Sequence, residues 1–282
     1  MLRHGRLLRR LRLVRMLTEK RLPLLPVFDT HAHLDDPDVS LPELLRELEG
    51  LRAVGWRGAL CAGYGPERFL AGRALCEADD RVVRACGLHP EWLAAHPDQV
   101  TREAGWRALQ SELDAAGVAA VGEIGLDRRA RDAFPLASQL SWMDRGLRLA
   151  AERSLPVVLH IVGWHGHALE AVGRCGVPNG GVVHRYSGPV ELVPSWVAAG
   201  LYLSLSLEPR EDPEKRAELA RAIPADRLLV ETDWPLRDHT YGQAFQALQD
   251  LCAHVAVARG ETPLEVAERS DRNSRALWGR PA

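Results

Sequence analysis

The chain has 282 residues, of which 46% are hydrophobic and 26% charged, and its formal net charge is −2. This length suits one large or two smaller domains, and the apolar fraction is sufficient for a full hydrophobic core. Five cysteines form no CxxC pair and leave one over under any pairing, which argues against a disulfide framework or a cysteine zinc site and predicts a reducing, cytoplasmic compartment. Because only short Gly and Pro clusters interrupt the chain, we expect one continuous domain over residues 23–282.

The first 22 residues differ in charge from the rest of the chain. They contain eight Lys or Arg and one acid, Glu19, which leaves 28 basic against 37 acidic residues in the remainder. This segment resembles an Arg-rich targeting or membrane-surface helix, although it has no signal-peptide apolar core and no span of 18 apolar residues. The simpler interpretation, which we favour, is that translation begins at Met16 and that the basic residues before it are a disordered extension. We expect no membrane partner.

From Pro26 onward, short β-branched or apolar runs alternate with amphipathic segments of helical period. The predicted strands are Val27–Thr30, Gly58–Ala62, Val82–Gly87, Val118–Ile124, Val157–Ile161, Gly181–His184, Leu201–Leu205 and Leu228–Thr232. The predicted helices include Leu41–Ala53, Thr101–Ala115, Gln139–Arg153, Arg216–Ala222, Tyr241–Ala258 and Pro263–Trp278. Eight strand–helix units in a chain of this size predict an α/β fold, a (β/α)8 TIM barrel with buried parallel strands.

Six ionisable residues lie at or just beyond the carboxyl ends of these runs. They are His31, His33, Glu123, His160, His184 and Asp233. A charged or imidazole side chain in a strand buried on both sides costs several kcal/mol unless it is paired or binds a metal. In a closed barrel the carboxyl ends of all strands meet at one mouth, where active sites of this architecture lie. Four histidines and two carboxylates at that mouth predict a metal centre.

Six ligands exceed the needs of one tetrahedral zinc, but they suit a site of two metals with a bridging carboxylate. We expect the first two histidines and Asp233 to hold one ion, His160 and His184 to hold the other, and Glu123 to lie between them. Such ions lie about 3.5–4 Å apart and share or polarise a water molecule.

Six short motifs, taken in this order, resemble those of the TatD family of metal-dependent hydrolases, within the amidohydrolase-like barrels. They are FDTHAHLD from Phe28, GLHP from Gly87, VGEIGLD from Val121, LPVVLH from Leu155, HRYSG from His184 and ETDWP from Glu231. The resemblance extends from about Phe28 to Trp278. It implies a metallo-dependent hydrolase barrel that hydrolyses phosphodiester bonds, typically in DNA, with two divalent ions and the same six ligands.

The expected chemistry is hydrolysis by a metal-activated water. A bound divalent cation lowers the pKa of its water from 15.7 to as little as about 7. We predict that Asp233 accepts the proton of that water and that Glu123 bridges the metals, which makes these two the catalytic carboxylates. A carboxylated lysine bridge is excluded, because the only lysines are Lys20 in the leader and Lys215 at a helix start. Four imidazoles favour zinc, whereas phosphodiester hydrolysis in the family is compatible with magnesium or manganese. The sequence therefore does not specify which metal binds.

Further residues are candidates for supporting the metals or the substrate. The resemblance implies that His89 faces the metals and contacts a substrate phosphate, although a lone histidine on a turn can be purely structural. Asp127, Ser187 and Glu231 are expected to orient ligands or the leaving group, since a ligating histidine normally donates its second N–H to an acceptor. Asn273 also matches a family position, and we interpret it as a helix cap.

The sequence departs from the family pattern where a substrate phosphate would be held. The family usually has an arginine two residues after the fifth-strand histidine, and this chain has Val162 there. Four residues are candidates to replace it, each of which can also be an ordinary loop residue: His165, His167, Arg185 and Arg128. Three aromatic residues could stack on a base or simply shape the pocket: Trp164, Trp234 and Tyr186.

The acidic body of the chain lacks the basic stripe of a protein that grips long duplexes, which favours DNA substrates that are short, single-stranded or bound by an end. The predicted function is therefore a TatD-like phosphodiesterase or exodeoxyribonuclease. Two alternatives stay open. One is a related barrel hydrolase acting on a non-nucleic ester, lactone or amide, and the other is a non-enzymatic partner in an assembly that keeps the metal for stability.

Overall fold

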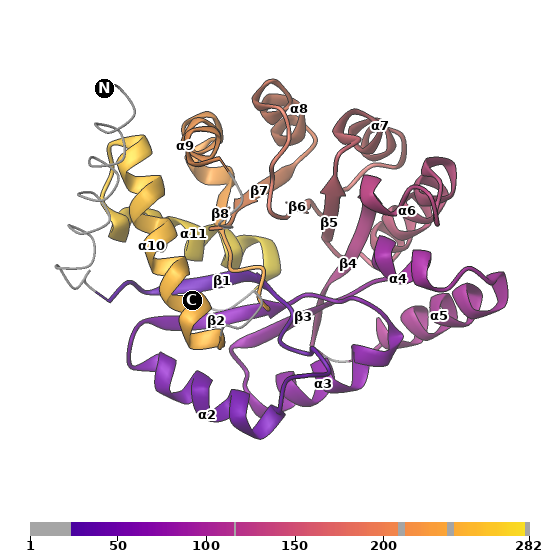
Figure 1. The fold of residues 1–282 in the computed structure, drawn as a ribbon, viewed down its shortest axis with the longest axis horizontal. Helices are drawn as coiled ribbons and strands as arrows, with labels where there is room; N and C mark the ends of the chain where they lie inside the picture. The colour runs from indigo at the N-terminus through magenta and orange to yellow at the C-terminus, as the bar shows by residue number, and fades with distance from the viewer. Residues whose placement is uncertain (1–23, 116, 208–211, 236–239, 280–282) are drawn as a thin grey trace, which may run out of the picture.

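The structure is a computed structural model that describes residues 24–115, 117–207, 212–235 and 240–279. The predicted basic extension, residues 1–22, lies outside the described residues. Figure 1 shows strands at the centre of the molecule and helices in a ring around them. No helix in the described part of the chain is long and apolar enough to cross a membrane.

Eight parallel strands form one sheet in sequence order, and the prediction of a (β/α)8 barrel is confirmed. The strands are β1 (Val27–Ala32), β2 (Trp56–Cys61), β3 (Val82–Cys86), β4 (Val118–Asp127), β5 (Val157–Val162), β6 (Gly181–Val183), β7 (Leu201–Leu205) and β8 (Leu228–Val230). The barrel closes between its first and last strands, where Asp233 N–H donates to the carbonyl of His31 (2.9 Å) and His33 N–H donates to that of Trp234.

The strand ends differ from the predicted ones where the site is built. β4 is longer than predicted and ends at Asp127, whereas β6 and β8 end before His184 and Glu231. Backbone N–H groups beyond those strands still bond to a neighbouring strand, since His184 donates to Leu159 and Glu231 donates to Leu205. These residues therefore extend the barrel wall without belonging to a regular ladder.

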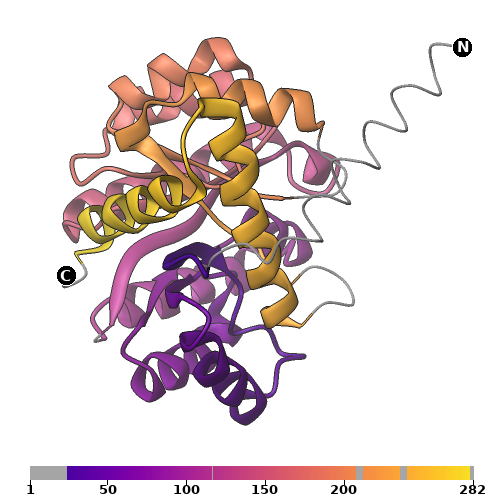
Figure 2. The same cartoon turned by 90° about the vertical axis from the view of Figure 1, so that its left-hand side faces the viewer.

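The helices cover the outside of the barrel. They are α2 (Leu41–Arg52), α3 (Phe69–Ala78), α4 (Pro90–Ala95), α5 (Gln99–Glu112), α6 (Leu136–Glu152), α7 (His165–Cys175), α8 (Val193–Ala198), α9 (Pro213–Ala222), α10 (Tyr241–Arg259) and α11 (Pro263–Trp278). The six predicted helices are present, with ends shifted by one to three residues except for α11, which matches. α10 and α11 lie together over the strands that begin and end the barrel (Figure 2).

The inside of the barrel holds a separate apolar layer to which every strand contributes. Its strand residues include Phe28, Leu60, Ala85, Ala120, Val158, Val182, Tyr202 and Leu229, packed with Leu277 and Trp278 of α11. Because strand side chains alternate between faces, the residues two positions further along share this inward face, as His160 does with Val158 and His184 with Val182. The apolar layer is thus the floor on which the polar residues of the mouth lie.

Candidate metal centre

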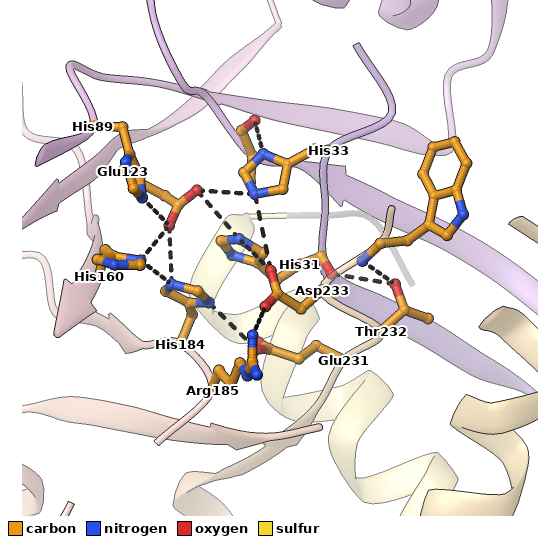
Figure 3. Close-up of polar contacts among 12 residues, drawn as sticks. His31, His33, His89, Glu123, His160, His184, Arg185, Glu231, Thr232 and Asp233 are labelled. Carbon is orange, nitrogen blue, oxygen red and sulfur yellow. Dashed lines mark hydrogen bonds and ion pairs between the residues drawn. The ribbon is translucent and has the colours of Figure 1, made fainter. Parts of the chain in front are cut away.

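Glu123 lies at the centre of the mouth and is fully buried (Figure 3). Its Oε2 atom lies 3.2 Å from Nε2 of His33 and 3.4 Å from Nε2 of His31. Its Oε1 atom lies 2.9 Å from Nε2 of His184 and 3.3 Å from Nδ1 of His160. The two oxygens of one carboxylate therefore face two different pairs of histidines, as a bridging ligand would.

Asp233 completes the side of the site that contains the β1 histidines. Its Oδ1 atom lies 3.7 Å from Nε2 of His31 and 3.8 Å from Nε2 of His33. Its backbone has a φ of 53°, in the left-handed region that non-glycine residues seldom adopt. The structure thus brings all six predicted ligands together, as two groups that share Glu123 (Figure 3).

The donor atoms at this centre fit a divalent metal. Both ring nitrogens of His31 and both carboxylate oxygens of Glu123 are buried, and they make no hydrogen bond within the described part of the chain. Buried polar groups without partners are costly, and imidazole nitrogen with carboxylate oxygen is the ligand set of zinc and related ions. Three groups of donor atoms lie close enough to hold an ion: His31, His33 and Asp233; His89, Glu123 and His160; and His31, His184 and Glu231.

Glycines let the chain bring Glu123 into the barrel. A Cβ atom at Gly87 would lie 2.4 Å from the carbonyl oxygen of Glu123, and one at Gly63 would lie 2.6 Å from that of Gly122. The backbone N–H of Glu123 donates to the carbonyl of Gly63 (2.9 Å). The β4–β5 register also shifts between Gly122 and Ile124. The local backbone at Glu123 therefore depends on close approach that only glycine allows on the neighbouring segments.

A buried network centred on Asp29 holds the ends of β1 and β8 together. Its Oδ2 atom accepts hydrogen bonds from the hydroxyls of Thr232 (2.6 Å) and Tyr241 (3.0 Å), and its Oδ1 atom accepts from Thr232 N–H (2.9 Å). The Tyr241 hydroxyl in turn accepts from the indole of Trp56 (3.2 Å). Burial raises the pKa of Asp29 to about 6 despite these donors. This network positions His31 and Asp233, which flank its members in sequence.

Two further carboxylates orient histidines at the site. Nε2 of His160 lies 3.1 Å from Oδ2 of Asp127, and Nδ1 of His184 lies 3.4 Å from Oε1 of Glu231. Ser204 donates to Glu231 and also accepts from the backbone N–H of Arg185 (3.0 Å). Asp127 and Glu231 thus lie where acceptors for ligating histidines are expected, as proposed from the sequence.

The charges of the centre depend on one another. Burial disfavours the ionised form of Glu123, yet the surrounding imidazoles, His184 first, hold its pKa well below the usual range. Burial likewise opposes protonation of His184, but the Glu123 carboxylate raises its pKa well above that of a free histidine. Burial and the neighbouring His160 lower the pKa of His89 strongly. A divalent cation binds the ionised form of a carboxylate, and the surrounding imidazoles favour that form of Glu123.

His89 lies among the predicted metal ligands. It is buried, with Nε2 3.7 Å from Oε1 of Glu123, and its ring packs edge-on against His160 with centroids 4.2 Å apart. Its Nδ1 accepts the backbone N–H of Glu91 and caps α4. His89 therefore lies in the group of donor atoms that includes Glu123 and His160.

The other predicted substrate-binding residues, Tyr186, Trp234 and Arg128, lie outside this group of donor atoms. Tyr186 is 3% exposed, donates its hydroxyl to the carbonyl of Pro189 and packs against His165, while Trp234 is 6% exposed and packs edge-on against Tyr241. Of the two roles foreseen for these rings, their burial supports shaping the pocket wall. Arg128 is exposed in a short 3₁₀ turn after β4, where its side chain lies against Gly163.

Two sequence-based interpretations are wrong, and a third has no support in the structure. Asn273 is no helix cap, because it lies within α11, where its amide donates to the carbonyls of Ala225 and Leu228 and ties that helix to β8. His165 and His167 are not loop residues, since α7 begins at His165. Ser187 is exposed, and its carbonyl accepts from Lys215. The described geometry therefore lends no support to a role for Ser187 in orienting ligands.

Sequence reasoning missed Tyr64 and Arg68, which line the mouth after β2. The ring of Tyr64 stacks on His89 with centroids 4.9 Å apart, and the guanidinium of Arg68 lies 4.6 Å from the centre of the same ring. Neither residue is in a recognisable motif. The one available signal was the Gly63–Tyr64–Gly65 sequence directly after a strand, which indicates a tight turn at the mouth.

Comparison with known proteins adds independent evidence. The family model described as TatD related DNase matches residues 28–279. The chain is 34% identical over 211 residues to the uncharacterized metal-dependent hydrolase YjjV of Escherichia coli, which covers 73% of this chain and 78% of the relative. It is 31% identical over 239 residues to a Cronobacter sakazakii protein named 3′-5′ ssDNA/RNA exonuclease TatD, which covers 80% of this chain and 88% of the relative.

Solved structures agree with the sequence comparisons. The crystal structure of YjjV, described as a TatD homologue from Escherichia coli, has a TM-score of 0.79 and 28% identity, covering 92% of this chain and all of that one. A hydrolase TatD family protein from Entamoeba histolytica has a TM-score of 0.75 and covers 91% of this chain and 99% of its own. At 17% identity, the latter structure shows the shared fold alone.

Proposed function

The chain belongs to the TatD-related family of metal-dependent hydrolases, and on that premise we propose that it is a two-metal phosphodiesterase that degrades short single-stranded nucleic acid from one end. The observation that carries this proposal is the placement of Glu123, whose two carboxylate oxygens face separate histidine pairs at 2.9–3.4 Å. A single carboxylate between two ligand groups is the arrangement that two-metal hydrolases use.

The residues at the mouth would hold the metals as follows. His31, His33 and Asp233 would bind one ion, His160 and His184 would bind the other, and Glu123 would contact both. His89 lies beside the second group, with its Nε2 atom 3.7 Å from Glu123. When bound, divalent ions at such a centre supply a water of lowered pKa and neutralise charge on phosphoryl oxygens.

Asp233 is suited to act as the proton acceptor for the attacking water. Burial opposes its ionisation, but the neighbouring histidines, His184 first, lower its pKa, so the carboxylate is ionised at neutral pH. Its side chain is 12% exposed, whereas that of Glu123 is fully buried. Asp233 is thus the carboxylate of the pair that incoming water and substrate can reach.

Two observations support nucleic acid of single-stranded form as the substrate. Outside the first 22 residues the chain has nine more acidic than basic residues, which disfavours tight binding along a long duplex. Several relatives with about 30% identity are named 3′-5′ ssDNA/RNA exonuclease, and we extend that substrate class and direction to this chain.

The experiment that tests this proposal is digestion of a single-stranded oligonucleotide, labelled at either end, during titration with Mn²⁺, Mg²⁺ or Zn²⁺. We expect metal-dependent release of nucleotides from the 3′ end by the wild type and none by Asp233→Asn. A duplex of the same sequence serves as the comparison substrate. Hydrolysis of a small-ester panel without any nucleotide release would contradict the proposal and would favour a barrel hydrolase of different specificity.

A further inference from the structure

Arg185 follows directly after the predicted ligand His184 and is held in an unusual backbone conformation. Its φ of 44° lies in the left-handed region, which non-glycine residues seldom adopt. Its backbone N–H donates to the hydroxyl of Ser204 (3.0 Å), and that hydroxyl also donates to Glu231. The position of the Arg185 backbone is therefore fixed by contacts with residues of the two following strand ends, directly with Ser204 and through it with Glu231.

The side chain of Arg185 reaches the outer side of Asp233. Its Nη1 atom donates to Oδ2 of Asp233 at 2.7 Å, while Oδ1 of the same carboxylate faces His31 and His33 (Figure 3). The Arg185 side chain is 33% exposed, compared with 12% for Asp233 and 0% for Glu123. The guanidinium is thus the outer neighbour of the metal centre, on the side that solvent reaches.

We propose that Arg185 binds the phosphoryl group of the substrate, by donating to a non-bridging oxygen of the phosphodiester that lies at the metals. The inference rests on the function proposed above and specifies how that site selects an anionic substrate. A guanidinium carries planar, charged N–H donors whose spacing matches the oxygens of a phosphate, and its charge persists at every working pH. The Arg185 guanidinium contacts Asp233, and Asp233 belongs to the group of ligands that would hold a metal next to the scissile phosphate.

The test compares Arg185→Gln with wild type and with Arg174→Gln. Arg174 carries the same charge and pairs with Asp144. It lies at the carboxyl end of α7, at the end of the barrel opposite the mouth, so its variant controls for the loss of one surface charge. Each protein is loaded with Mn²⁺ until its metal content saturates, and inorganic phosphate is titrated by calorimetry. We expect Arg185→Gln to bind phosphate about ten- to hundredfold more weakly, as for loss of a charge-assisted hydrogen bond. Arg174→Gln should match the wild type.

Turnover gives a second, independent readout. Bis(4-nitrophenyl) phosphate carries one negative charge, and diethyl 4-nitrophenyl phosphate carries none while releasing the same 4-nitrophenol. We expect Arg185→Gln to raise KM for the anionic diester about tenfold or more and to lower kcat/KM for the diester by a larger factor than for any hydrolysis of the neutral triester. Arg185→Lys, which keeps the charge but not the planar donors, should fall between the wild type and Arg185→Gln.

The outcomes separate this inference from the proposed function. Unchanged phosphate affinity in fully metal-loaded Arg185→Gln would overturn the inference while leaving the hydrolase assignment intact. Failure of Arg185→Gln to saturate with Mn²⁺ would overturn it too, because Arg185 would then act by holding Asp233 in place. If the wild type hydrolyses no phosphodiester but Arg185→Gln still loses phosphate affinity, the proposed function fails and the anion site stands.

Discussion

Nε2 of His160 lies 3.1 Å from Oδ2 of Asp127, which leaves Nδ1 as the nitrogen that faces Glu123 and His184. An ionised carboxylate only accepts hydrogen bonds, so Nε2 carries a proton, and Nδ1 is the nitrogen that would offer its lone pair to a bound metal. Hydrogen bonding outweighs burial and lowers the pKa of Asp127, which keeps it ionised. Arg129 adds to this by binding both oxygens of Asp127.

Asp127→Asn should weaken metal binding without unfolding the protein. The asparagine amide can present an N–H to His160 and lacks the charge that selects the Nε2–H tautomer, so Nδ1 is no longer reliably available. We expect metal affinity to fall about 10- to 100-fold, the usual effect of losing the acceptor behind a ligating histidine. Titration with a fluorescent zinc chelator measures this. The matched control is Asp144→Asn at the surface pair with Arg174, and equal affinities in the two variants would contradict the assigned tautomer.

Removal of metal should lower the thermal stability of the wild type. Glu123 and His31 are buried without hydrogen-bond partners inside the described part of the chain, so a cation that binds only the folded state stabilises it by mass action. A metal at about 100 times its Kd contributes about 2.7 kcal/mol, which corresponds to roughly 5–10 °C in Tm for a chain of this size. Calorimetry before and after dialysis against EDTA measures the difference. Glu123→Gln should show little shift, and a shift as large as that of the wild type would mean that the metal binds elsewhere.

Tyr241→Phe should destabilise the protein and leave its metal content unchanged. The lost hydroxyl donates to Asp29 and accepts from the Trp56 indole, so the substitution leaves two buried polar groups with fewer partners. The expected cost is about 1–3 kcal/mol in the free energy of unfolding, measured by urea denaturation. Thr240→Ala, at the exposed cap of the same helix, controls for effects on α10 itself and should cost about 1 kcal/mol. A wild-type unfolding curve for Tyr241→Phe would show that the Asp29 network does not stabilise the barrel.

His165 should make the stability of the protein depend on pH between about 6.5 and 4. Burial lowers its pKa to about 4, so in the folded state the ring stays neutral while the unfolded chain takes up a proton. Because the unfolded state binds more protons in this window, the free energy of unfolding falls as the pH falls, by up to about 3 kcal/mol at pH 4. Urea denaturation in EDTA at pH 7.5 and pH 4.5 measures it for wild type and His165→Gln. The loss should be smaller in His165→Gln, and equal losses would contradict the buried neutral state.

Much of the architecture could be predicted because it depends on local patterns. β7 and α11 match their predicted bounds, and all eight strands occur in the predicted order, since apolar runs and helical periodicity are properties of neighbouring residues. The gathering of His31, Glu123, His160 and Asp233 also followed from the sequence. Parallel strands in a closed barrel end at one mouth, so residues at strand ends must meet.

Only the tertiary structure decided how these residues face one another. It placed His89 among the ligand atoms, buried Tyr186 and Trp234 in the wall, and brought Arg185 to the outer oxygen of Asp233. Each of these results depends on contacts between distant parts of the chain, such as the bond between Asp29 and Tyr241, 212 positions apart. Sequence periodicity specifies on which face of an element a residue lies. The contacts of each side-chain atom depend on the rotamer, and packing against distant segments of the chain selects that rotamer. Sequence periodicity carries no information about those distant segments.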